Sequence, residues 1–285
     1  MPDLVTTLGH STIQHGHEND RVYLMELDDR DMPDLLPLIN ALAVQESYGK
    51  IFAKVTARWA ATFEDDGFRT EAMVPGFFRG EENGHFMGKY LDPDRAADSR
   101  DDEIGRILDL ARKKGGRQGE AGAGTGYTIR RCTLEDCVAM AALYRDTFPS
   151  YPFPVHDPKF LAETMADHVA YFGACGKNGK LAALASAEQY RRGGHVEMTD
   201  FLTVTGQRRR GMASRLLTTM EKEMRRRGLA VAYTIARALS PGMNITFARA
   251  GYRHAGTLIN NTQICGRIES MQVWYKWLPQ AGSHN

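Results

Sequence analysis

The sequence predicts a mixed α/β fold in two units, and three observations support this prediction. Strand-like segments are interleaved with segments of helical periodicity along most of the chain. A glycine-rich run, residues 115–126, has the composition of a linker. The 285 residues, of which 42% are hydrophobic, can bury a core on each side of that run. We therefore expect a smaller N-terminal α/β domain over residues 20–92 and a larger mixed-sheet domain over residues 127–278.

Charge and composition restrict the partners. The 36 basic and 35 acidic residues give a formal net charge of +1, which argues against nucleic acid as a partner. No segment approaches the ~20 apolar residues of a membrane span, and the N-terminus lacks the pattern of a secretory signal. No two cysteines have the close spacing of a zinc or redox site. We expect a cytoplasmic protein without a membrane partner. The sequence leaves the oligomeric state open, with a homodimer among the alternatives.

Residues 1–19 are expected to form a flexible leader. The histidines in this leader, His10, His15 and His17, are close in sequence, but no second cluster of ligands completes a metal site. We therefore expect no bound metal.

The N-terminal domain is expected to begin with a strand at residues 21–27. A long helix is expected at residues 31–55, with Asp31 as its cap and Pro33 in its first turn. The remaining expected segments are a helix at 56–68, strands at 69–80 and 84–92, a connector at 93–126 that holds one charged helix at 101–114, and a tail at 279–285.

The larger domain has the order strand, two helices, three strands, helix, strand, helix and two strands. Thr133 and Asp136 form a capping box at the start of the first helix, and Asp157 with Pro158 begins the second. The expected ranges are 127–132, 133–148, 157–168, three strands within 169–204, 214–228, 230–236, a helix from residue 240, 256–264 and 267–278.

The stretch TGQRRRGMAS, residues 205–214, joins the last of the three strands to the long helix. Arg208, Gly211 and Ala213 form the pattern R-x-x-G-x-A, in which glycine lets backbone N–H groups face a ligand and the helix N-terminus favours phosphate. A second arginine triplet, residues 225–227, complements the dipole at the helix end, but cations at a helix start are unfavourable without an anion. The alternatives are a site for a phosphorylated cofactor and an ordinary solvated basic turn.

The element order and the R-x-x-G-x-A motif of residues 127–278 resemble the GCN5-related N-acetyltransferase (GNAT) family. SPGMNITFARAGYRHAGTLINNTQICGRIESMQVWYKWL, residues 240–278, and SYGKIFAKV, residues 47–55, look like parts of the two halves of the β-lysine N-acetyltransferases. The resemblance implies a GNAT acyl-CoA N-acyltransferase fold that moves acetyl from acetyl-CoA to the terminal (N6) amine of β-lysine. The product would be the compatible solute Nε-acetyl-β-lysine. The alternatives are another amine, such as lysine, a polyamine or a protein N-terminus, and a non-catalytic acetyl-CoA sensor.

The same resemblance implies which residues bind acetyl-CoA. Backbone N–H groups of Leu202 and Val204 would polarise the thioester carbonyl, and Asn244 would contact the pantetheine arm. The pyrophosphate would lie on residues 208–214, which are Arg208, Arg209, Arg210, Gly211, Met212, Ala213 and Ser214.

One residue departs from the family pattern. Phe247, expected beside the cofactor, stands where many members carry a tyrosine that protonates the departing CoA thiolate. Phenylalanine has no proton to donate. The donor is then Tyr252, Tyr233 or water, or the thiolate leaves without a specific acid.

The reaction also needs a base, because an alkylammonium with a pKa of ~10.4 must lose a proton before it attacks a thioester. The strand HVEMTDFLTV offers Glu197 and Asp200, which lie on opposite faces unless a bulge intervenes. Glu197 is favoured because family members often draw this group from the same strand. The alternative is an ordinary solvated carboxylate.

Substrate contacts are expected from both domains. Glu269 alternates with apolar residues in its strand, so a ligand ammonium or an internal arginine is expected to neutralise it. Asn260 and Asn261 are candidate amide contacts, although such residues also end strands. In the N-terminal domain, the resemblance places three residues near the acceptor carboxylate: Tyr48, Lys50 and Lys54.

Overall fold

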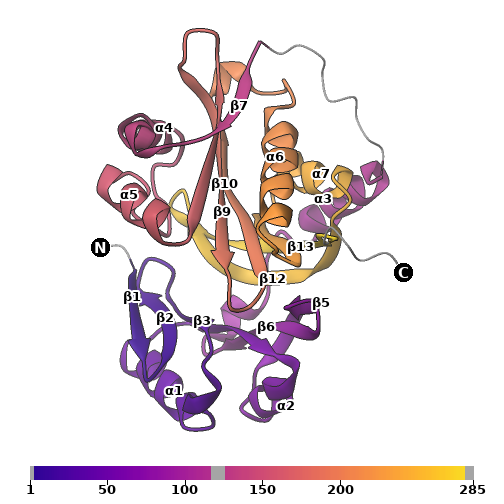
Figure 1. Ribbon diagram of the computed structural model, residues 1–285. Coiled ribbons are helices and arrows are strands. Elements are labelled where there is room, and N and C mark those ends of the chain that lie inside the picture. Colours follow the sequence, from indigo (N-terminus) through magenta and orange to yellow (C-terminus); the bar gives the residue numbers. More distant parts are fainter. Residues whose placement is uncertain (1–2, 117–125, 280–285) are drawn as a thin grey trace.

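The computed structural model describes residues 3–116 and 126–279, which share one continuous sheet (Figure 1). Within these residues the sheet has 13 strands in the order β1-β2-β3-β4-β6-β5-β12-β13-β11-β10-β9-β8-β7. Strands of the N-terminal unit form one end, and strands of the larger unit form the other. The mixed α/β class predicted from the sequence is therefore confirmed. Most of the glycine-rich run, residues 117–125, and the tail residues 280–285 lie outside the described part.

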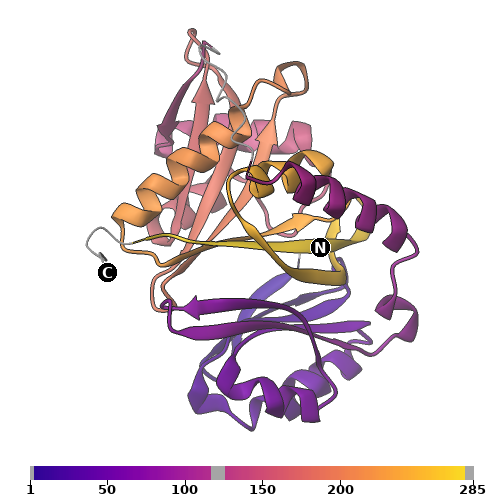
Figure 2. The same ribbon diagram turned by 90° about the vertical axis from the view of Figure 1, so that its right-hand side faces the viewer.

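The N-terminal unit occupies the lower end of the molecule in both views (Figures 1 and 2). Its helices α1 and α2 cover a hydrophobic cluster that includes Ile39, Ile51 and Phe63. The elements are β1 (Leu4–Leu8), β2 (Ser11–Gly16), β3 (Arg21–Glu26), α1 (Leu35–Gln45), β4 (Lys50–Thr56), α2 (Ala57–Asp65), β5 (Arg69–Phe78) and β6 (Glu82–Tyr90).

The predicted flexible leader is wrong for its described residues, because they form strands β1 and β2. These strands pair with each other, and β2 pairs with β3. Ile13 is buried in the core, and the carboxylate of Asp31 accepts hydrogen bonds from the His10 amide and the Ser11 hydroxyl at the β1–β2 turn. Asp31 thus fastens this hairpin and does not cap α1, which begins only at Leu35.

The predicted long helix at residues 31–55 is also wrong, because it divides into α1 and β4. Ser47 adopts the left-handed conformation with a φ of 58°. The amides of Ser47 and Tyr48 donate to the carbonyls of Val44 and Ala43, which ends α1 in a Schellman motif. The following run from Lys50 is buried on both faces, and such a run does not by itself distinguish a strand from a helix.

The connector holds a short 3-10 turn, Pro93–Ala96, and the expected charged helix α3 (Asp101–Lys114). Helix α3 packs beside α7 of the larger unit (Figure 2).

The larger unit follows the predicted order of elements. Helices α4 and α5 cover one face of its sheet, and α6 and α7 cover the other (Figure 1). The elements are β7 (Thr128–Arg131), α4 (Cys137–Thr147), α5 (Pro158–Asp167), β8 (Val169–Cys175), β9 (Leu181–Tyr190), β10 (His195–Thr203), α6 (Met212–Arg226), β11 (Val231–Arg237), α7 (Pro241–Arg249), β12 (Arg253–Ile264) and β13 (Arg267–Trp277).

The two units meet where β5 pairs with β12. Gly256 lies opposite Ala72, and a Cβ on Gly256 would lie 2.1 Å from the Glu71 carbonyl oxygen, so the close approach requires glycine. Beside this contact, Lys50 Nζ donates to Glu71 at 2.7 Å and to the Ile259 carbonyl at 2.8 Å. None of the helices in the described ranges is long and apolar enough to cross a membrane.

Candidate active site

Strands β10 and β11 separate at the site. Their parallel pairing covers only residues 195–197 of β10 and 231–233 of β11. Beyond this point β10 remains paired with β9, and β11 remains paired with β13. The strands therefore diverge toward their carboxyl ends, where open α/β sheets bind ligands.

The arginine corner, residues 208–211, lies exposed between β10 and α6. Arg209 and Gly211 have φ angles of 64° and 72°, and a Cβ on Gly211 would meet no atom within 4 Å. Glycine is therefore needed there for the left-handed backbone and not for space. Within the part of the chain that the structure describes, Arg208, Arg209 and Arg210 have no carboxylate at ion-pair distance. Three cations and the first amides of α6 thus meet at an exposed corner whose charge is suited to an anion.

The remaining corner residues differ in what they can offer a ligand. Met212 is buried in the core beneath α6, so it can offer only its backbone, whereas Ser214 is exposed. At the other end of α6, Arg226 and Arg227 pair with Glu223 at 2.9 Å, so two arginines of this second triplet have a carboxylate partner.

The backbone donors predicted at Leu202 and Val204 are wrong. The Val204 amide donates to the Ala182 carbonyl of β9 at 3.0 Å, and Leu202 pairs with Leu184 of the same strand. Because amide direction alternates along a strand, the amides of Phe201 and Thr203 face the opposite side, toward the gap. The prediction therefore named the two amides that face β9 and not those that face the gap.

A β-bulge brings both candidate bases into one cavity. The pairing of β10 with β9 shifts between Thr199 and Leu202, and Asp200 has a φ of 54°. The extra residue cancels the alternation that would place Glu197 and Asp200 on opposite faces. Both carboxylates line a cavity of about 300 Å³.

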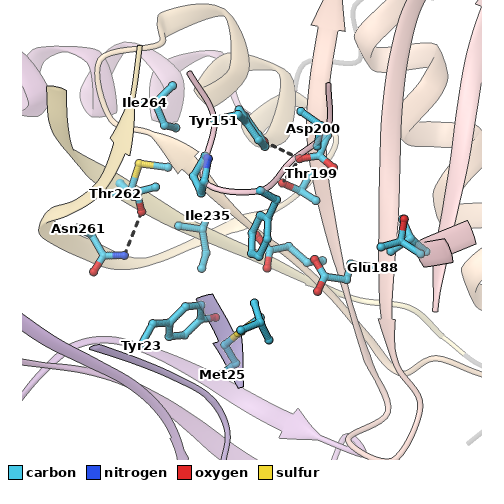
Figure 3. A pocket seen from close by; sticks show the side chains of 18 of the residues that line it. Tyr23, Met25, Tyr151, Glu188, Thr199, Asp200, Ile235, Asn261, Thr262 and Ile264 are labelled. Atoms are coloured by element: carbon cyan, nitrogen blue, oxygen red, sulfur yellow. Dashed lines mark hydrogen bonds between the residues drawn. The ribbon is translucent and has the colours of Figure 1, made fainter. Parts of the chain in front are cut away.

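The cavity lies between the two units (Figure 3). Strands β8 to β13 and helix α5 form much of its wall, the loop between α4 and α5 contributes Tyr151, and the N-terminal unit contributes Arg21 and Tyr23. Figure 3 shows Asn261 and Thr262 on one side of the cavity and Glu188 and Asp200 on the other.

Three carboxylates in the cavity differ in their partners. Burial opposes ionisation of Glu188, but His168, whose Nε2 lies 3.6 Å from Oε1, and Tyr190 Oη, which donates at 2.6 Å, hold its pKa below the usual range. Burial raises the pKa of Asp200, although the Ser186 hydroxyl, at 2.6 Å, and Tyr151 both donate to it.

Glu197 lies directly opposite Glu188 in the β9–β10 pairing. Burial and then the charge of Glu188 raise the pKa of Glu197 to about 7, while Lys54 and Tyr233 act in the opposite direction. Lys54 Nζ lies 3.2 Å from Tyr233 Oη and 4.5 Å from the ring centre of Tyr190. Of the three acids, Glu197 is the one best suited to take up and release a proton near neutral pH.

Several residues expected to contact the acceptor lie elsewhere. Glu269 forms a two-bond ion pair with Arg237 at 2.7 and 2.8 Å, so the internal arginine and not a ligand neutralises it. Asn260 donates to the carbonyls of the connector, and Tyr48 is buried in the N-terminal core with its hydroxyl 3.1 Å from His15. Asn261, in contrast, lines the cavity.

The expected contacts on α7 are structural as well. Asn244 is fully buried, donates to the carbonyls of Arg237 and Ser240, and accepts from Trp274, so its amide has no free group for pantetheine. Phe247 is buried against the rings of Phe201 and Tyr252.

Tyr252 does not line the cavity that holds the carboxylates, so the structure gives no support to its role as an acid. Its burial, together with the neighbouring Glu221, raises its pKa well above the usual value. Phe247 faces inward from α7, and Tyr252, three residues after the end of that helix, packs against Phe247 in the same hydrophobic cluster.

Three charged residues of the cavity were not predicted from the sequence: Arg21, Glu188 and His168, whose pKa the neighbouring Glu188 raises to about 9. Arg21 begins the stretch RVYLMEL, and Glu188 is the only charged residue of LAALASAEQY. A charge in such a stretch was the available signal, because a buried charge needs a partner.

Known proteins share sequence with most of this chain. Residues 138–252 match the Acetyltransferase (GNAT) family. The chain is 33% identical over 272 residues to the β-lysine N(6)-acetyltransferase of Methanococcus maripaludis, which covers 95% of this chain and 98% of that protein. It is 31% identical over 260 residues to the β-lysine N(6)-acetyltransferase of Methanosarcina mazei, covering 84% and 95%. It is 28% identical over 268 residues to the N-acetyltransferase YodP of Bacillus subtilis, covering 94% and 96%. The chain therefore belongs to the GNAT family of acetyl-CoA-dependent N-acetyltransferases.

Proposed function

We propose that the protein transfers acetyl from acetyl-CoA to the N6 amine of β-lysine, 3,6-diaminohexanoate, and so forms Nε-acetyl-β-lysine. The observation that carries this proposal is the set of charges around the cavity: Glu188, Glu197 and Asp200 from the sheet, and Arg21 from the N-terminal unit. β-Lysine has two ammonium groups and one carboxylate, which these side chains complement. The Methanococcus and Methanosarcina relatives carry this activity in their names and match most of the chain.

Glu197 serves as the general base in this proposal. The N6 ammonium gives a proton to Glu197, and the freed lone pair forms a bond to the thioester carbonyl carbon. The amides of Phe201 and Thr203 on the gap side of β10 stabilise the resulting oxyanion. Collapse of the tetrahedral intermediate breaks the C–S bond. The attacking nitrogen, which still carries an extra proton after attack, loses it as the amide forms, and one proton is taken up by the departing CoA thiolate.

The arginine corner binds the pyrophosphate of acetyl-CoA in this proposal. Arg208, Arg209 and Arg210 lie next to the first amides of α6, and the gap between β10 and β11 opens at the same end of β10. The pantetheine arm can then extend along the unpaired side of β10 toward Glu197.

Three further points belong to this proposal: a cytoplasmic location, a role of the product as a compatible solute, and a homodimeric state. Light scattering coupled to size-exclusion chromatography tests the homodimer.

The test is an acceptor panel with the purified full chain. Acetyl-CoA is supplied with β-lysine, lysine, spermidine or a peptide, and CoA release gives kcat/KM for each. We expect β-lysine to have the highest kcat/KM. A higher value for another amine overturns the acceptor assignment, and CoA binding without turnover on any amine supports a sensor instead.

A further inference from the structure

Arg21 is a buried cation whose charge has no partner within the described chain. Its side chain belongs to β3, lines the cavity and is only 4% exposed. In residues 3–116 and 126–279, no carboxylate lies at ion-pair distance from it, and only Nη1 donates hydrogen bonds, to the Asn261 carbonyl and to Thr262 Oγ1 at 3.2 Å. Its Nε is buried without a partner.

The unused nitrogens lie on one edge of the guanidinium. Nε and Nη2 together form a planar fork that matches the two oxygens of a carboxylate. The guanidinium carbon lies 5.0 Å from the ring centre of Tyr23 and 5.8 Å from that of Phe52, so two aromatic rings lie beside the group. A buried charge with a free fork is costly unless an anion occupies it.

Asn261 places an unused acceptor beside this fork. Its side chain is 1% exposed and lines the same cavity, and its Oδ1 has no hydrogen-bond partner in the described part of the chain. Its own backbone carbonyl accepts from Arg21, so the two residues are in direct contact. A free donor fork and a free acceptor therefore lie on neighbouring residues. Figure 3 shows Asn261 on the side of the cavity opposite to Glu188 and Asp200.

We propose that Arg21 binds the carboxylate of the acceptor through Nε and Nη2, and that Asn261 Oδ1 accepts a hydrogen bond from the nearby 3-ammonium group. This inference rests on the proposed function and adds that the enzyme selects amino acids over simple diamines. Binding the acceptor by this end leaves its N6 amine to reach the carboxylates. Since β3 lies outside residues 138–252, the N-terminal unit supplies this selectivity.

The test compares each amino acid with the diamine that lacks its carboxylate. The pairs are β-lysine with 1,4-diaminopentane and lysine with 1,5-diaminopentane, and the readout is the ratio of kcat/KM values within a pair. In Arg21→Met, we expect the preference of the wild type for the amino acid to fall about 10- to 100-fold, as expected for the loss of hydrogen bonds to a charged group. Arg21→Lys keeps the charge without the fork and should recover only part of the preference.

Arg30→Met is the matched control, because Arg30 is an exposed arginine of the same unit. It should leave both ratios unchanged. An equal loss on amino acid and diamine in Arg21→Met makes Arg21 a structural residue and overturns the proposal. The proposal is also overturned if the wild-type enzyme has no higher kcat/KM for the amino acid than for the matching diamine, and this measurement needs no variant. If the wild-type enzyme prefers lysine over β-lysine, the proposed function is refuted. The comparison of lysine with 1,5-diaminopentane still tests the role of Arg21 in that case.

Discussion

Glu197 and Glu188 face each other across β9 and β10, yet their neighbours differ. The cation of His168 and a hydrogen bond from Tyr190 hold Glu188 ionised, so it can face an ammonium group as a negative charge. Burial beside that charge raises the pKa of Glu197 to about 7, so this carboxyl can exchange a proton near neutral pH. The neighbours of each carboxylate therefore set its pKa, and the pKa decides whether it can act as a base or as a fixed negative charge.

We expect kcat/KM for β-lysine to rise with pH through about 7 and then to level off, because only ionised Glu197 can accept the proton. In Glu197→Gln this limb should disappear, and kcat should fall by about 10²- to 10⁴-fold, the usual contribution of a general base. Steady-state kinetics across the neutral range measure both effects.

Glu64→Gln serves as the control for this variant, because Glu64 is exposed on α2 far along the chain from β10. It should retain the wild-type profile. If Glu197→Gln keeps the wild-type rate and Asp200→Asn loses it, the base is Asp200 and the assignment is wrong.

The sequence predicted some cavity residues and missed others for a physical reason. Glu197 and Asp200 lie on one strand next to the arginine corner, so local reasoning found them. Arg21 and Glu188 reach the cavity through pairing between distant strands, which no local pattern records. For Glu269, the sequence predicted that the carboxylate is buried and needs a cation. Only the folded structure identifies that cation as Arg237.

At the scale of elements, local signals predicted the larger unit well. The capping box of Thr133 and Asp136 forms, and Asp157 accepts from the Lys159 amide at the start of α5. The sequence predicted that Glu197 and Asp200 lie on opposite faces of the strand unless a bulge intervenes, and the structure has that bulge in β10. The sequence alone could not predict the bulge, because a shift in strand pairing leaves no sequence signature. The helix expected at residues 31–55 failed because β4 is buried on both faces and so lacks the alternation of a half-exposed strand.

The turn into α6 gives a prediction for the cofactor. Arg208→Ala should raise the KM for acetyl-CoA about 3- to 30-fold, because an exposed arginine makes weaker bonds to phosphate than a buried one. Gly211→Val should raise this KM as well, since a β-branched residue resists the left-handed φ of 72°. Initial rates at varied acetyl-CoA and saturating β-lysine measure the change.

Arg226→Ala is the control for the corner, because Arg226 is an exposed arginine at the other end of the same helix. An effect of Arg226→Ala as large as that of Arg208→Ala would contradict a local phosphate site and would indicate a general effect of charge.

At the scale of the whole molecule, the cavity exists because both units share one sheet. The ion pair of Lys50 and Glu71 lies at their junction, with side chains 0% and 2% exposed. Lys50 also donates to the Ile259 carbonyl, and Glu71 accepts from the Ile259 amide. The pair therefore connects β4 and β5 to β12.

Lys50→Met should destabilise the protein by about 3–5 kcal/mol, because it leaves Glu71 buried and unpaired. Lys89→Met, which removes a more exposed partner of Asp66, should cost about 1 kcal/mol or less. Urea unfolding followed by circular dichroism measures both values. Equal losses in the two variants would show that the junction pair has no special role.

The position of the acetyl group on the product tests the central claim most directly. β-Lysine is incubated with acetyl-CoA and the full chain, and fragmentation mass spectrometry locates the new amide. Arg21 contacts Asn261, and Glu188 and Asp200 lie across the cavity from Asn261, so we predict acetylation at N6 alone. Acetylation at the 3-amine would mean that the acceptor binds in the reverse direction, and it would contradict both the base assignment and the role of Arg21.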